Sequence, residues 1–239
     1  MEDSVYIVSE LCGQWGGSIS RAEQMILQSK IAGADAVKVQ FYDTYQLPGE
    51  NRERWEYLSM THEQLLRLKK FSENLNIDFF ASAFDRNRIS YLHSIGTNTF
   101  KIASMMLEFK FDLCKQSLDM FENIFISLGV WDLNKKGLPF TNDNVTYFHC
   151  VAEYPHSFER AIELMPEKFD EIEGFSDHSV GIDASIEAVK RGARYIEKHF
   201  TTDHALQSDT EGAHTCSMNF DELRMLRKEV DRICVQKFH

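Results

Sequence analysis

Short runs of apolar and β-branched residues alternate along this chain with longer stretches of helical periodicity. Several of the short runs are apolar on both faces, a pattern typical of strands buried in a parallel sheet. We predict eight strands from them. They cover residues 5–11, 35–42, 77–84, 98–104, 123–130, 145–154, 171–177 and 193–200.

The stretches between these runs carry helix signals. "SRAEQMILQSKIAGA" begins with a serine suited to cap a helix and ends at Gly33, and "THEQLLRLKKFSENL" begins with a capping box completed by Gln64. Between the fifth and sixth strands, "WDLNKKGLPFTND" contains Gly137 and Pro139, so we expect a loop or a single turn there. Eight strand–helix units predict one α/β domain over residues 1–239, a TIM (β/α)8 barrel with a degenerate fifth helix.

Composition narrows the class of protein. Hydrophobic residues make up 43% of the chain, enough for a large core, and the net charge of −11 argues against a nucleic-acid-binding surface, which needs a basic face. No apolar run reaches the roughly 18 residues of a membrane span, and "MEDSVYIVSEL" lacks the features of a signal peptide. The five cysteines form no CxxC pair, which favours reduced thiols in a cytoplasmic protein.

Two lysines lie inside otherwise apolar strands. In a TIM barrel the chemistry is placed at the C-terminal ends of the strands, and a lysine buried there is costly without a negative partner. Lys38 and Lys101 therefore indicate a bound anion, with nearby serines as neutral donors. The alternative is a structural ion pair with a glutamate of a neighbouring strand, and the sequence leaves both interpretations open. The other polar residues at the strand ends are Glu10, Gln40, Ser82, Asp85, Ser104, Ser127, Glu153, Tyr154, Ser176, Asp177 and Glu197.

Two histidines follow neighbouring predicted strands. His178 comes at the end of the seventh strand, and His199 ends the eighth, one β/α unit later. Adjacent strands would hold them side by side, and neutral imidazole is a common ligand of divalent metals. A lone strand histidine is more often a hydrogen-bonded core residue, and we interpret His149 in this way. We also assign a structural role to its neighbour Cys150.

The segment "SDHSVGIDASIEAVKRGARYIEKHFT" resembles the S-D-H-x-x-G-I…A-x-x-x-G-A-x-x-I-E-K-H-F-T signature of the sialic acid synthases, the NeuB family. "AGADAVKVQ", "FKIAS" and "HCVAEYP" resemble its other blocks in the same order, so the likeness covers nearly the whole chain. It implies an enzyme that condenses phosphoenolpyruvate with an aldehyde sugar, typically N-acetylmannosamine, and releases phosphate. It also implies a divalent metal, with manganese expected and magnesium, cobalt, zinc or iron as alternatives.

Carried over residue by residue, the resemblance implies His178 and His199 as metal ligands. The resemblance implies that Glu10 positions water or transfers its proton. Related metal-dependent synthases of 3-deoxy-manno-octulosonate phosphate have a metal-binding cysteine at the place of Cys12. Cys12 is therefore expected to be either a third metal ligand or only a packed thiol. The catalytic set is Glu10, Lys38, Gln40, His178 and His199. The substrate-binding set is Lys38, Lys101, Ser104, Ser127, Tyr154, Ser176 and Asp177.

Several positions depart from the family pattern. Trp15 stands at the place of a histidine, Met106 at that of an acidic residue that touches the sugar, Ala83 at that of a threonine near the phosphoenolpyruvate carboxylate, and Ala152 at that of an Asn or Ser. The segment "HALQSDTEGAH" is longer than usual, and the family's C-terminal antifreeze-like domain does not follow. We therefore expect a synthase with a different acceptor sugar.

Two other functions remain open from the sequence. One is a non-catalytic barrel that binds metal and a phosphorylated ligand, and the other is metal-assisted hydrolysis of a sugar phosphate. We also expect a homodimer or larger homo-oligomer formed by barrel faces. Trp15, the loop "WDLNKKGLPF" and residues 203–214 are the expected lids over the barrel mouth.

Overall fold

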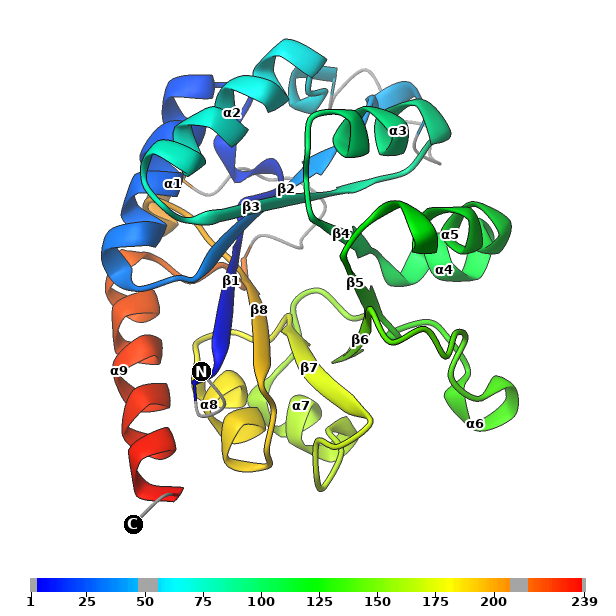
Figure 1. Cartoon of the computed structure of the whole chain (residues 1–239). Coiled ribbons are helices and arrows are strands. Elements are labelled where there is room, and N and C mark those ends of the chain that lie inside the picture. The colour runs from blue at the N-terminus through cyan, green and yellow to red at the C-terminus, as the bar shows by residue number, and fades with distance from the viewer. Residues whose placement is uncertain (1–3, 47–55, 207–214, 238–239) are drawn as a thin grey trace.

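The computed structural model of the chain describes residues 4–46, 56–206 and 215–237. Eight parallel strands form a closed barrel in sequence order, with β8 paired to β1 (Figure 1). They are β1 (Tyr6–Glu10), β2 (Ala36–Phe41), β3 (Asp78–Ala83), β4 (Thr99–Ile102), β5 (Asn123–Ser127), β6 (Val145–Cys150), β7 (Ile172–Asp177) and β8 (Tyr195–His199). The predicted TIM barrel is confirmed, and every predicted strand is present in somewhat shorter form.

Helices surround the barrel on its outside (Figure 1). They are α1 (Ile19–Ala32), α2 (His62–Asn74), α3 (Arg86–Ser94), α4 (Ser104–Phe109), α5 (Phe111–Ser117), α6 (Leu133–Lys136), α7 (Phe158–Leu164), α8 (Asp183–Lys190) and α9 (Phe220–Lys237). Short 3₁₀ turns are η1 (Cys12–Trp15), η2 (Thr44–Gln46), η4 (Leu118–Met120) and η5 (His204–Leu206). The single turn of α6 is the degenerate unit that the sequence predicts. In the part of the chain described, no helix is long and apolar enough to cross a membrane.

Local signals in the sequence set the helix ends. The Thr61 hydroxyl accepts a hydrogen bond from the Gln64 backbone N–H, and the Gln64 side chain accepts one from the Thr61 N–H, so the capping box that starts α2 is present. Helix α1 ends at Gly33, whose φ of 98° lies in the left-handed region that favours glycine. A Cβ on Gly33 would lie 2.7 Å from Cγ of Arg227 on α9, so the glycine also permits close packing of α9 against the end of α1.

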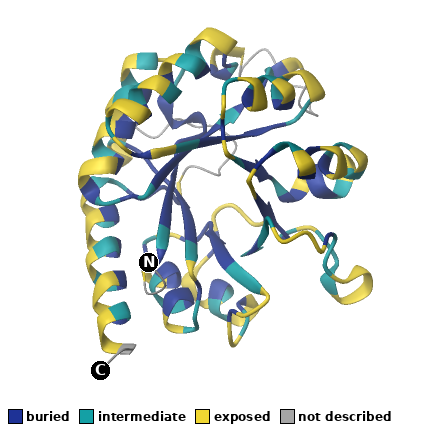
Figure 2. Ribbon diagram, viewed as in Figure 1, coloured by how far each residue is buried: buried dark blue, intermediate teal, exposed yellow. Residues whose placement is uncertain are grey.

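The barrel has two apolar cores, which Figure 2 shows as dark blue strands and inward helix faces. One lies between the strands and the helices. The other fills the lumen and consists of Val8, Ala36, Phe80, Phe125 and Phe148, with Tyr6 and Tyr195 packed against it. Side chains alternate along a strand, so the residues two positions further on face the same lumen nearer its C-terminal end.

Those next positions are polar. Together with their neighbours on the remaining strands they form a set that we call the mouth layer. Its members are Glu10, Lys38, Ser82, Lys101, Ser127, Cys150, Ser176, Glu197 and His199. An apolar plug therefore lies beneath a polar layer at the end of the barrel where TIM-barrel active sites are found.

Gly174 on β7 makes room for the lumen plug. A Cβ at this position would lie 2.6 Å from the ring of Phe148, its partner on β6. We predict that Gly174→Ala lowers the free energy of unfolding by about 1–3 kcal/mol, since the ring must shift in a packed lumen. Urea denaturation checks this, and an unchanged midpoint would mean that the Phe148 ring moves aside freely.

Candidate active site

Four charged side chains of the mouth layer form a continuous chain of ion pairs. Lys38 Nζ lies 2.5 Å from Glu10 Oε2 and 3.1 Å from Glu197 Oε1, and Lys101 Nζ lies 3.2 Å from Glu197 Oε2. All four residues are buried. Two carboxylates thus neutralise two ammonium groups. The structural ion pair considered as the alternative exists for Lys38, whose partner Glu10 lies on the neighbouring strand β1, whereas Glu197 on β8 bridges both lysines across the lumen.

These contacts decide the charge states in the mouth. Burial lowers the pKa of Lys38 to about 8, against the attraction of Glu197, and burial also lowers the pKa of Lys101. Burial alone would raise the pKa of Glu197, but its attraction to Lys101 and Lys38 outweighs this and lowers the pKa. At neutral pH Lys38 and Glu197 therefore carry their charges, and the two lysine Nζ atoms lie 3.1 and 3.2 Å from the Glu197 carboxylate.

Hydroxyl groups extend the lysine cluster. Lys101 Nζ lies 3.3 Å from Ser176 Oγ, which lies 3.0 Å from Ser127 Oγ, and the ammonium sits 3.7 Å from the centre of the Phe148 ring. Cations and hydroxyl donors are therefore concentrated at one end of the lumen. This arrangement suits a ligand with several anionic oxygens.

A further hydroxyl comes from Ser82, whose strand position pairs with Lys101. Ser82 Oγ is buried and has no hydrogen-bond partner among the described residues. Ala83, where the sequence comparison placed the family's threonine, belongs instead to the core between strands and helices. The serine, and not the alanine, is thus the β3 residue that faces the mouth.

Two other predicted residues lie near this layer. Gln40 is half-buried on β2, two positions beyond Lys38, and Ser104 is the first residue of α4, directly after β4. Both are at the C-terminal end of the barrel, as expected.

The two histidines are neighbours. Their ring centres are 5.5 Å apart. His178 Nδ1 lies 2.9 Å from the carbonyl oxygen of Val151; a carbonyl only accepts, so Nδ1 carries the proton and Nε2 keeps its lone pair. Burial lowers the pKa of His178 to about 4, which makes it neutral at pH 7. A neutral imidazole with a fixed tautomer is suited to bind a divalent cation, so the pair fits the expected metal.

Tyr154 covers the histidine pair. Its ring centre lies 3.9 Å from that of His178 and 6.2 Å from that of His199, and 42% of the residue is exposed. Tyr154 therefore stands between the histidines and solvent, where a side chain of the predicted substrate-binding set can reach a ligand.

Cys12 lies in η1, directly after β1, with a backbone φ of 41°. Its N–H donates to Glu10 Oε1 at 2.8 Å, which fixes the Glu10 carboxylate beside Lys38. Across the described residues, no three His, Cys, Asp or Glu side chains gather closely enough to hold a metal. Cys12 thus does not form such a group with the two histidines, and its role as a third ligand stays a hypothesis.

Asp177 requires a correction. Its side chain points away from the mouth into the layer between strands and helices, and none of it is exposed. It lies 3.0 Å from Lys198 Nζ and accepts hydrogen bonds from Ser179 and Ser185. An enclosed carboxylate with these partners does not contact a ligand in the mouth, so Asp177 is removed from the substrate-binding set.

Two of the expected lids are also placed elsewhere. Trp15 is 2% exposed and belongs to the outer core. Trp131, in the second expected lid, stacks on Phe111 and donates a hydrogen bond from Nε1 to the Gly137 carbonyl oxygen, so that loop folds on itself and on α5. Residues 207–214 of the third lie outside the described residues.

His149 lies on the outer side of β6, where its ring stacks on Phe175, and burial lowers its pKa to about 4, with His156 adding to the effect. The unfolded chain binds this proton near pH 6.5, so the folded protein should lose stability as pH falls from about 6.5 towards 4, by up to ~1.4 kcal/mol per pH unit. We predict that His149→Gln flattens this slope in urea unfolding at pH 7.5, 6 and 5. His178 contributes in the same direction, so part of the slope remains. An identical slope in the variant would contradict the assignment.

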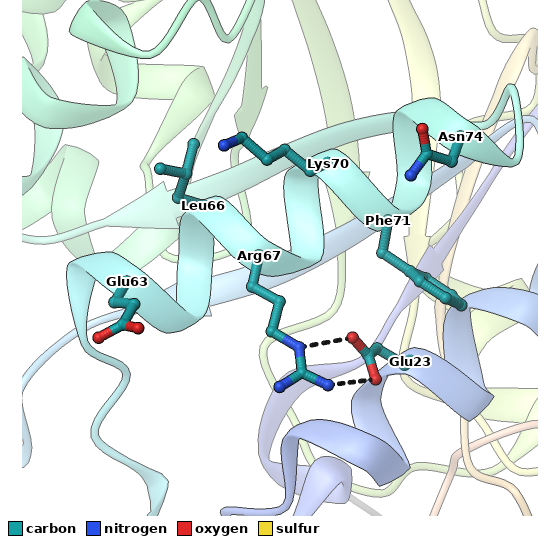
Figure 3. Close-up of a pocket in the computed structure, with 7 residues that line it drawn as sticks. All are labelled: Glu23, Glu63, Leu66, Arg67, Lys70, Phe71 and Asn74. Atoms are coloured by element: carbon teal, nitrogen blue, oxygen red, sulfur yellow. Dashed lines mark hydrogen bonds and ion pairs between the residues drawn. The ribbon is translucent and has the colours of Figure 1, made fainter.

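A surface groove of about 370 Å³ lies away from the mouth, along α1 and α2 (Figure 3). Arg67 crosses it and makes two hydrogen bonds, of 2.7 and 2.9 Å, to the Glu23 carboxylate. None of the predicted site residues lines this groove. The candidate active site is therefore the barrel mouth.

A TIM barrel whose charged residues gather at the C-terminal ends of its strands has the arrangement of a barrel enzyme. The chain belongs to the NeuB family, whose family model matches residues 25–237. An N-acetylneuraminate-9-phosphate synthase of Drosophila melanogaster is 30% identical over 94% of this chain and 66% of its own length. An uncharacterized protein of Methanocaldococcus jannaschii is 29% identical over 87% of this chain and 68% of its own. The chain thus spans about two thirds of the length of these relatives.

Solved structures agree with this family. The sialic acid synthetase of Leptospira borgpetersenii serovar Hardjo-bovis, in complex with citrate, superposes with a TM-score of 0.83 at 30% identity, covering 99% of this chain and 86% of that one. A truncated 3-deoxy-D-arabino-heptulosonate 7-phosphate synthase of Thermotoga maritima gives a TM-score of 0.72 at 10% identity. That second likeness concerns the fold alone.

Proposed function

We propose that this protein condenses phosphoenolpyruvate with an aldose to give a 2-keto-3-deoxy sugar acid, a sialic-acid-like nonulosonate, and releases phosphate. Membership of the NeuB family and similarity to proteins named as sialic-acid-type synthases support the reaction class. The observation that carries the proposal is the bridged pair Lys38 and Lys101 in the same mouth as the two histidines.

Phosphoenolpyruvate carries a carboxylate and a phosphate, and the two lysines would bind the oxygens of both groups. Lys38 and Lys101 would exchange part of their contact with Glu197 for contact with the ligand's oxygens. The hydroxyls of Ser82, Ser104, Ser127 and Ser176 would add neutral donors. Since these residues lie on or directly after rigid strands, the donors are already in place before the substrate arrives, which is electrostatic preorganisation.

His178 and His199 would hold the divalent cation, with manganese as the expected metal. When bound there, the cation supplies Lewis-acid polarisation of the aldehyde oxygen. Tyr154 covers both imidazoles and would meet the sugar, together with Gln40 and Glu10 at the same end of the barrel.

The bonds made and broken are simple to state. C3 of phosphoenolpyruvate attacks the aldehyde carbon, and the aldehyde oxygen takes up a proton to become a hydroxyl group. Water adds at C2, the C2–O bond to phosphate breaks, and the water oxygen becomes the ketone oxygen of the product. Of the two protons of the water, one replaces the proton taken up by the aldehyde oxygen and the other leaves with phosphate. Lys38, Lys101 and the serines stabilise negative charge on the phosphate and carboxylate. Glu10, held by the Cys12 N–H and by Lys38, positions water or moves its proton.

The acceptor is expected to differ from N-acetylmannosamine. Met106, at the place of the family's sugar-contacting acid, is 2% exposed and packs in the outer core, so that contact is missing. Mannose and a bacillosamine-type hexose are the other acceptors to test.

The test incubates the protein with phosphoenolpyruvate, Mn²⁺ and each aldose in turn, with mass spectrometry for the adduct and an assay for phosphate. We expect an adduct and equal amounts of phosphate with at least one aldose. Phosphate released from a sugar phosphate without an aldose acceptor would favour the hydrolase. Binding of manganese and phosphoenolpyruvate without product from any aldose would favour the non-catalytic barrel.

A further inference from the structure

A fully buried ion pair lies directly behind the two histidines. Asp177 precedes His178 and Lys198 precedes His199 in the chain, and the two charged side chains meet with 3.0 Å between Oδ2 and Nζ. Neither side chain has any exposed surface. Neighbouring residues of an extended chain point to opposite sides, so the ion pair lies outside the barrel wall while the histidines face the mouth.

The contacts of this pair connect β7, β8, α8 and the turn that follows β7. Asp177 Oδ1 accepts hydrogen bonds from the Ser179 N–H at 2.8 Å and from the Ser179 hydroxyl at 2.6 Å. Its Oδ2 accepts one from the Ser185 hydroxyl of α8 at 2.6 Å, and Lys198 Nζ donates to the Ser179 carbonyl oxygen at 2.7 Å. The turn that carries His178 is therefore bonded to both strands and to α8 by its neighbours.

Stability alone does not account for this arrangement. A buried ion pair costs much desolvation, and well-packed apolar residues in its place are often equally or more stabilising. Its bonding capacity is used within the protein, so it is not itself a ligand site. What the pair does fix is the position of the residue that follows each of its members, His178 after Asp177 and His199 after Lys198.

We propose that the Asp177–Lys198 pair positions the two histidines of the metal site, because it holds the turn that carries His178 against the end of β8. The inference rests on the proposed function, because it concerns the two histidines as metal ligands. His178 follows Asp177 and is bonded to Val151 on its other side, whereas His199 ends the strand that carries Lys198. Removal of the pair frees the turn at Ser179, and the 5.5 Å ring separation is then no longer enforced.

A second ion pair provides a matched control. Arg227 on α9 lies 3.1 Å from Asp35 Oδ2, just before the N-terminal end of β2, and also donates to the Val5 carbonyl oxygen. It joins elements at the opposite end of the barrel from the histidines. Its loss should lower stability without affecting metal binding.

The experiment measures Mn²⁺ affinity of the metal-free protein by isothermal titration calorimetry, and stability by urea denaturation. The main variant is the double substitution Asp177→Asn/Lys198→Met, which removes both charges together and so avoids leaving one of them buried alone. Outer-shell partners of metal ligands typically contribute 10–100-fold in affinity, and we expect a loss in this range, with Arg227→Met binding as the wild type does.

A milder variant keeps the result interpretable if the double variant folds poorly. Ser185→Ala removes one hydrogen bond to Asp177 and leaves both charges, so we expect a few-fold loss of Mn²⁺ affinity with the fold retained.

Wild-type affinity in a folded double variant, or an equal loss in Arg227→Met, would overturn the positioning role and leave the metal site standing. Binding that persists at full strength in both His178→Ala and His199→Ala would instead overturn the metal site, and the positioning role with it.

Discussion

Replacing Lys101 with methionine should lower kcat/KM for phosphoenolpyruvate roughly 10²- to 10³-fold. The ammonium group lies within 3.3 Å of Glu197 and Ser176, and Lys101 is 1% exposed, so no other cation can take its place without rearrangement of the mouth. Loss of one partner of a buried charge pair typically costs about 2–5 kcal/mol. Phosphate release at varied phosphoenolpyruvate concentration measures the effect.

The control separates binding from stability. Lys101→Met alone leaves Glu197 with fewer partners and is expected to destabilise the fold. Adding Glu197→Gln removes the excess negative charge, so the double variant should regain stability but not activity. Wild-type kinetics in a stable double variant would show that Lys101 serves only as a structural ion pair.

The second large effect concerns the metal. Chelation with EDTA should abolish product formation, and Mn²⁺ should restore it. His178→Ala and His199→Ala should each weaken Mn²⁺ binding by more than the roughly 10–100-fold that loss of an outer-shell partner produces, because two protein imidazoles leave little redundancy. Turnover and Mn²⁺ titration of each variant measure this.

His149→Ala is the matched control for these substitutions. His149 is a strand histidine whose ring stacks on Phe175 on the outer side of the barrel. It should keep normal metal affinity. Full activity of the wild-type protein after chelation would show that the reaction requires no metal.

The fold could be predicted from the sequence because buried parallel strands leave an uninterrupted apolar pattern. The strand ends could not. The sixth strand was predicted to continue to residue 154, but β6 ends at Cys150. Residues 151–154, which read Val-Ala-Glu-Tyr, continue the apolar and β-prone pattern of the strand, whereas the hydrogen bonds that define the strand have already stopped.

The candidate site could be predicted in outline. Lysine in an apolar strand and histidine at the ends of two successive strands are strong local signals, and the structure places all four residues at the mouth. Strand alternation could also have identified Glu197, since it shares the face of His199 on β8. Its role as the bridge between two lysines could not be predicted, because this depends on distances between three strands.

Alternation also explains the two misplaced residues. Asp177 follows Ser176 directly, so the two cannot face the same side, and the same holds for Ala83 and Ser82. Trp15 is a different case. It lies in a 3₁₀ turn that begins with a residue at positive φ, and the direction of a side chain in such a turn has no simple period in the sequence.

The most direct measurement is the fate of the solvent oxygen during turnover in H₂¹⁸O, with phosphate analysed by ³¹P NMR. If water attacks C2 and the C2–O bond breaks, the released phosphate keeps the enol oxygen of phosphoenolpyruvate and contains no ¹⁸O, and its release requires the aldose. That is the result predicted here. Phosphate that carries one ¹⁸O would show attack at phosphorus, and phosphate that appears at the same rate without aldose would show hydrolysis in place of condensation. Either result would contradict the proposed condensation.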